Sequence, residues 1–120
     1  FVMGCGRIFE GDPDMMWASL EKLLALPDQT VIYCSHEYTI ANAAFARSVD
    51  PDNAALAARQ EAIAELRENG FPTVPTRLDL EKATNPFLRV DNAAIRAHLG
   101  METASNAAVF TEIRKRKDHF

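Results

Sequence analysis

The chain has 120 residues, of which 48% are hydrophobic and 25% charged, and its formal net charge is −4. This balance is typical of a folded globular protein and excludes a disordered chain. The surplus of acidic residues argues against general nucleic-acid binding, which depends on Lys and Arg neutralising phosphates. The longest apolar runs are far shorter than the roughly 20 residues that span a bilayer. We therefore predict no nucleic-acid partner and no membrane partner.

The first residues indicate that the sequence belongs to a longer protein. Phe1 is not an initiator methionine, and residues 1–3 are typical of the end of an apolar strand. The two cysteines, Cys5 and Cys34, have no framework spacing, which favours free thiols in a reducing compartment. We expect a cytoplasmic fragment.

The opening segment is predicted to be α/β. Two closely spaced glycines permit a sharp turn before Arg7. A helix is expected over residues 13–25, with Asp12 as its N-cap. Residues 30–34 are β-branched and aromatic without alternation, as in a strand buried on both faces. Strand, helix and strand in this order favour a parallel pair joined by a crossover helix.

The rest of the chain is expected to be mainly α-helical. Asp91 and Ser105 are candidate caps of the last two helices, and Gly70 and Gly100 are stop signals. Residues 71–77 contain two prolines and are predicted to be extended. The expected helices cover residues 41–49, 53–69, 92–99 and 106–117. The second of these helices has Asp52 or Asn53 as its expected cap.

His36 is the strongest candidate for a functional residue. It directly follows the predicted strand and precedes Glu37 and Tyr38, a carboxylate and a phenol suited to supporting a metal-ligating imidazole. A hydrogen-bonded structural histidine is the commoner alternative at a strand end. No second histidine lies at metal-site spacing, so the chain is not expected to hold a complete metal site.

A run of four cations near the C-terminus is a second candidate. Four consecutive cations on an acidic chain can favour a small anionic ligand. Cations at a solvent-exposed helix end are also favoured by the helix dipole, whether or not a ligand binds them. The sequence leaves both interpretations open. The run consists of Arg114, Lys115, Arg116 and Lys117.

Six blocks of sequence, taken in order, carry a family resemblance. They are GCGRIFEG at residues 4–11, YCSHEYT at 33–39, the stretch 42–47, PTVP at 72–75, NPFLR at 85–89 and RKRKD at 114–118. Together they resemble the C-terminal part of glyoxalase II, the hydroxyacylglutathione hydrolase family of the metallo-β-lactamase superfamily. The resemblance covers essentially the whole chain.

The resemblance implies both a fold and an activity. Residues 1–38 would be the C-terminal end of a metallo-β-lactamase αββα sandwich, and residues 39–120 a helical glutathione-binding domain. Family members hydrolyse the thioester of S-lactoylglutathione to glutathione and D-lactate, a step of methylglyoxal detoxification. They do so at two metal ions, usually including zinc and sometimes iron or manganese, which need no protein nucleophile.

Five residues resemble the family's glutathione contacts. Arg7 resembles a basic residue that helps to bind glutathione, and Phe9 takes a place where some members carry tyrosine. Tyr38 resembles a tyrosine near the glutathione backbone. Arg114 and Lys117 resemble two cations that hold the glycine end of the tripeptide.

His36 resembles the last metal-binding histidine of the family. The other ligands, a His-x-His-x-Asp-His motif, another histidine and a bridging aspartate, lie upstream of Phe1 in the family and are not in this sequence. We therefore expect the fragment alone to be inactive, and its partner to be the missing N-terminal metallo-β-lactamase domain.

Two other functions stay open. The first is a non-catalytic helical module for glutathione binding or protein interaction. The second is a glutathione-dependent persulfide dioxygenase, a relative that uses one iron. The helical tail with Arg114 and Lys117 favours the thioesterase over the dioxygenase.

Overall fold

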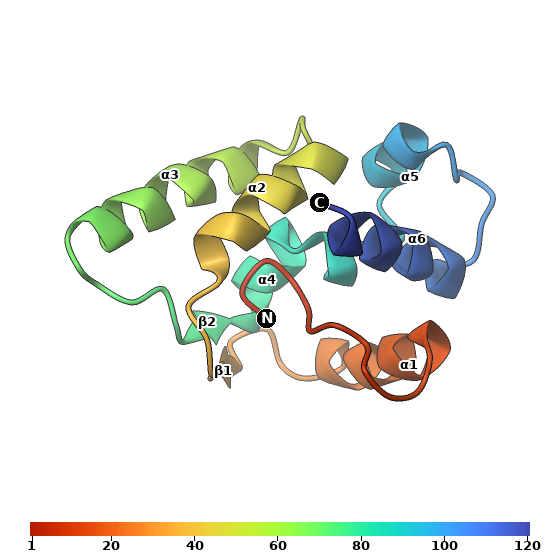
Figure 1. The fold of residues 1–120 in the computed structure, drawn as a ribbon, viewed down its shortest axis with the longest axis horizontal. Coiled ribbons are helices and arrows are strands. Elements are labelled where there is room, and N and C mark those ends of the chain that lie inside the picture. The colour runs from red at the N-terminus through yellow and green to blue at the C-terminus, as the bar shows by residue number, and fades with distance from the viewer.

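The computed structural model describes residues 1–120 as a mainly helical structure with one small two-stranded sheet. Figure 1 shows α2 beside α3 on one side of the molecule, α1 below α6 on the other, and α4 between them. None of the helices combines the length and the apolar content needed to cross a membrane. The elements are α1 (Pro13–Leu24), β1 (Val31–Ile32), α2 (Thr39–Val49), α3 (Ala54–Glu68), β2 (Thr76–Arg77), α4 (Leu78–Thr84), the 3-10 helix η1 (Pro86–Leu88), α5 (Ala93–Leu99) and α6 (Asn106–Asp118).

The helices α1, α3, α5 and α6 begin where polar side chains cap them, whereas α2 and α4 have no side-chain cap. Asp12, Asn53 and Ser105 each accept a hydrogen bond from a backbone N–H three residues further on. Such caps satisfy donors that the first turn leaves free. The cap of α5 is Asn92 and not the predicted Asp91, because the Asn92 side chain is the one that accepts the N–H of the first turn.

No helix is predicted over residues 78–84, yet these residues form α4. The segment has only 7 residues and lies between two proline-containing stretches. Short helices are marginal on their own and depend on tertiary packing. Here Leu78 and Glu81 are fully buried, so contacts with distant parts of the chain stabilise the helix.

The predicted strand arrangement is wrong. β1 has two residues and pairs antiparallel with β2, so no parallel pair and no αββα sandwich form within this chain. The run expected to be buried on both faces is instead open, with Val31 49% and Tyr33 82% exposed. A β-branched run predicts a strand, but it does not identify the strand's partner or what covers its faces.

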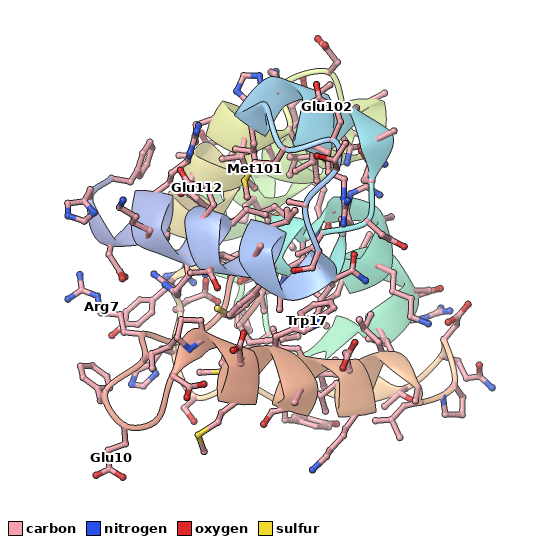
Figure 2. The ribbon with its side chains drawn as sticks, turned by 90° about the vertical axis from the view of Figure 1, so that its right-hand side faces the viewer. Arg7, Glu10, Trp17, Met101, Glu102 and Glu112 are labelled. Carbon is pink, nitrogen blue, oxygen red and sulfur yellow. The ribbon has the colours of Figure 1, made fainter.

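One hydrophobic core joins the first 38 residues to the rest of the chain. Trp17 and Leu20 of α1 belong to the same buried cluster as Phe87 of η1 and Phe110 of α6. The ring centroids of Trp17 and Phe110 lie 5.8 Å apart, and Figure 2 shows Trp17 between α1 and α6. The domain boundary at residue 38 stays a prediction, and the core extends across it.

A buried polar network holds the first four residues, which form a turn and not the predicted strand. Glu81 forms an ion pair with Arg59 and accepts a hydrogen bond from the N–H of Met3 at 2.8 Å. Asn85 donates to the carbonyl of Gly4 at 2.8 Å. Met3 has a φ of 56°, a conformation that costs free energy for a residue other than glycine. The network offsets that cost by holding both ends of the turn.

Candidate functional site

A hollow of about 270 Å³ lies between the glycine turn and the segment that follows β1. It brings His36 and Tyr38 together with Cys5 and Gly6, which are distant in sequence. A larger hollow of about 440 Å³, between α1 and α4, contains none of the predicted site residues. The remaining lining residues of the first hollow are Phe1, Ile32, Tyr33, Cys34, Ser35 and Asn42.

Close packing shapes the turn beside this hollow. A Cβ atom added at Gly4 would lie 2.7 Å from the side chain of Asn42, closer than real Cβ contacts allow. The amide of Asn42 also donates to the carbonyl of Val2 at 3.1 Å. Asn42 is therefore a site-shaping residue whose role the sequence pattern alone does not reveal. The only signal is its place in a block that resembles the family.

His36 is an exposed residue whose ring stacks on Tyr38. The ring centroids lie 5.0 Å apart and the planes differ by 3°. No three His, Cys, Asp or Glu side chains gather closely enough to hold a metal ion anywhere in the chain. These residues do not by themselves fit a metal ion, because a stable site needs three or four protein ligands. The role of His36 as one ligand stays a prediction.

Glu37 binds Thr73 and does not support the imidazole of His36 by any hydrogen bond. Its carboxylate accepts the backbone N–H of Thr73 at 2.6 Å and the hydroxyl of Thr73 at 2.7 Å. Burial by itself raises the pKa of Glu37, but the two hydrogen bonds from Thr73 and the charge of Arg67 outweigh it, so the pKa lies below its ordinary value. Glu37 thus ties the start of α2 to the loop before β2.

We expect Glu37→Gln to lower the unfolding temperature at neutral pH and to lose that effect in acid. Because the folded-state pKa lies below the unfolded one, the stabilisation is present above the unfolded pKa and disappears as pH falls through the folded pKa. Melting curves of both proteins, recorded from neutral to strongly acidic pH, should converge at the acid end. A gap that stays constant with pH would contradict a contribution from the charge.

The three predicted ligand cations gather at the C-terminal end of α6. Burial, then the charge of Arg114, then the charge of Arg7 lower the pKa of Lys117 below its ordinary value. None of the chain's ion pairs involves Arg7 or Lys117. Figure 2 shows Arg7 on the side of the molecule where α6 ends. Neighbouring cations without paired counter-charges attract a small anion.

Arg114 differs from the other two cations because only 5% of its side chain is exposed. Its Nη1 donates to the carbonyls of Cys5 and Gly6 at 2.8 and 3.3 Å, while its Nε and Nη2 donate to Asp118. The guanidinium carbon lies 5.2 Å from the ring centroid of Phe87. The prediction of a solvent-exposed helix end is therefore wrong for Arg114, because the N-terminal turn covers it. Its contact with a ligand stays a prediction.

The other candidates occupy different surroundings. Tyr38 is 62% exposed and lines the hollow, whereas Phe9 is 88% exposed and does not. Burial raises the pKa of the Cys5 thiol, and the hydrogen bond from Arg114 only partly opposes this. A thiol that stays protonated is a poor nucleophile.

Arg114 bonds to the turn that lines the hollow, and Arg7 follows that turn in sequence. A concave surface with a few polar groups next to it is typical of a module that binds a small ligand. Residues 37–120 match the family described as Hydroxyacylglutathione hydrolase C-terminus. The chain belongs to this family.

Curated relatives support the same conclusion. The chain is 62% identical over 120 residues to a hydroxyacylglutathione hydrolase of Rhizobium meliloti (strain 1021), with 100% of this chain and 47% of the relative aligned. It is 61% identical over 119 residues to the protein of the same name from Ruegeria pomeroyi, with 99% and 47% aligned. It is 58% identical over 120 residues to that of Maricaulis maris, with 100% and 47% aligned. The chain therefore spans about half the length of these relatives.

Proposed function

We propose that this chain is the C-terminal part of a metal-dependent hydroxyacylglutathione hydrolase. In that role it binds the glutathione part of S-lactoylglutathione, whose thioester is hydrolysed to glutathione and D-lactate. Family membership and the names of the relatives support this assignment over a persulfide dioxygenase. The structural observation that carries the proposal is that Arg114, which shares the end of α6 with Lys117, donates to the carbonyls of Cys5 and Gly6. Cys5 and Gly6 line the hollow that contains His36.

Glutathione suits this surface in charge. At neutral pH it carries two carboxylates, and charge-assisted hydrogen bonds to Arg and Lys are stronger than neutral ones. Arg7 and Lys117 have no ion-pair partners within the chain, so their donors are open to such a ligand. The exposed Tyr38, whose ring stacks on His36, lines the hollow and adds a ring face and a hydroxyl to this surface.

The reactive end of the substrate needs groups from outside this chain. We propose that His36 supplies one ligand to a pair of metal ions, with zinc first and iron or manganese as alternatives. The remaining ligands, together with most of an αββα domain that residues 1–38 complete, would come from the half of the relatives that this chain does not cover. Bound metal ions make hydroxide available near neutral pH. The fragment alone is expected to be inactive, and cytoplasmic location stays a prediction.

The test is Lys117→Ala in the full-length protein. Lys117 would hold a carboxylate remote from the thioester, so its contribution should be equal in the ground state and in the transition state. We expect KM for S-lactoylglutathione to rise about 10-fold, the lower end for a hydrogen bond to a charged group, with kcat changed by no more than a few-fold. Steady-state kinetics at two salt concentrations measure both.

Lys115→Ala is the matched control, because Lys115 lies in the same cationic run but is exposed and outside the cluster. It should leave KM unchanged. A thioester that lacks the glycine carboxylate is the second control, and Lys117→Ala should not weaken its binding further. If Lys117→Ala weakens the binding of the full and the truncated thioester equally, the cationic run is only a favourable helix end and does not bind the glycine carboxylate.

A further inference from the structure

The last residue of α6 is Asp118, a carboxylate at the end of the helix where the dipole disfavours negative charge. It accepts two hydrogen bonds from Arg114, at 3.2 Å from Nε and 2.9 Å from Nη2. The Asp118 side chain is 44% exposed, whereas that of Arg114 is only 5% exposed, so Asp118 neutralises a buried charge. Arg114 has no other ion-pair partner in the chain.

The hydrogen bonds of Arg114 divide between its two sides. Asp118 takes Nε and Nη2, and the remaining nitrogen, Nη1, donates to the carbonyls of Cys5 and Gly6. Gly6 is followed directly by Arg7, and no ion pair holds the Arg7 side chain. A carboxylate that fixes the plane of a guanidinium also fixes the direction of its free N–H groups. The contacts thus run from Asp118 through Arg114 to the backbone just before Arg7.

We propose that Asp118 is a positioning residue for ligand binding: it orients Arg114, whose guanidinium holds the turn at residues 5–6 and so keeps Arg7 on the side of the molecule where α6 ends. This inference rests on the proposed function and names the device that arranges its binding site. The ligand groups concerned are the carboxylates of glutathione.

Charge alone predicts the opposite result. A carboxylate beside a cation cluster repels an anionic ligand and reduces the net positive charge of the cluster. If Asp118 acted only through its charge, its removal would strengthen glutathione binding. If Asp118 positions Arg114, its removal weakens binding, because the turn that carries Arg7 becomes mobile. The sign of the effect therefore separates the two explanations.

The experiment compares Asp118→Ala and Asp118→Asn in the full-length protein. We expect Asp118→Ala to raise KM for S-lactoylglutathione and Kd for glutathione about 3- to 10-fold, below the loss of a direct charged hydrogen bond, while kcat stays within about two-fold. Asp118→Asn keeps one acceptor oxygen and should show a smaller rise. Glu112→Ala is the control: Glu112 forms an i,i+4 pair with Arg116 at 2.9 Å on the same helix, with the acid before the base. Figure 2 shows Glu112 on the side of α6 that faces away from α1.

A double-mutant cycle tests the route through Arg114. The rise caused by Asp118→Ala should disappear in an Arg114→Ala background, because coupled residues do not have additive effects. A rise of the same size without Arg114 would overturn the proposal, and so would an unchanged or lower Kd in Asp118→Ala. If Asp118→Ala does not fold, Asp118→Asn replaces it in the test, provided that its melting temperature is unchanged. An unaltered KM in Asp118→Asn then overturns the proposal.

The outcomes also distinguish this inference from the function on which it rests. If the full-length protein neither binds glutathione nor cleaves its thioesters, the proposed function and the positioning role both fail. If Lys117→Ala raises KM while the Asp118 variants do not, the function stands and only the positioning role is lost.

Discussion

Glu81→Ala is expected to lower the free energy of unfolding by about 3–5 kcal/mol, the usual cost of removing one partner of a buried ion pair. Arg59 would be left as an uncompensated charge in a site where its side chain is 7% exposed. The N–H of Met3 would also lose its acceptor. Urea unfolding followed by circular dichroism measures the loss, because the midpoint shifts with stability when the slope is unchanged.

Two comparisons show whether the buried charge is the cause. Glu61→Ala removes an exposed carboxylate from α3 and should change stability by less than about 0.5 kcal/mol. The double change Arg59→Met with Glu81→Leu should cost less than Glu81→Ala alone, since apolar pairs often replace buried ion pairs without loss. If the double variant is less stable than Glu81→Ala, the hydrogen bonds of Glu81 to the turn and to Thr76 contribute more to stability than its charge does.

In the full-length protein, His36→Ala is expected to lower kcat by more than about 100-fold. Changing even the outer partners of a metal ligand costs about 10- to 100-fold in metal affinity or activity, so loss of the ligand itself should cost more. The fold should survive, because the imidazole is exposed and outside the hydrophobic core. Metal analysis of the purified variant, its melting temperature and its kcat test the three statements together.

His98→Ala is the control for this experiment. His98 is also exposed, but its ring bonds to the carbonyl of Ser48 at 2.9 Å and it does not line the hollow. It should leave metal content and kcat at the parental level. If His36→Ala behaves in the same way, His36 is a structural histidine that stacks on Tyr38, and its assignment as a metal ligand is wrong.

Local chemistry explains the features that the sequence predicts well. The starts of α1, α3 and α6 follow from Asp12, Asn53 and Ser105, whose short side chains cap a helix wherever they precede it. The left-handed φ of 70° at Gly100 ends α5 for a similarly local reason. The family resemblance also rests on sequence alone, because its blocks are read in order along the chain, and the family match confirms it.

Only the tertiary structure decides the features that depend on distant partners. The antiparallel pairing of β1 with β2 joins segments more than 40 residues apart, which no local pattern specifies. The hydrogen bond between Glu81 and Met3 spans 78 residues, and that between Arg114 and Cys5 spans 109. In sequence, Glu81 looks like an ordinary surface charge, and Arg114 looks like a charge at an exposed helix end. Both side chains are buried because the N-terminal turn folds over them. They can remain buried there because their charged groups are hydrogen-bonded.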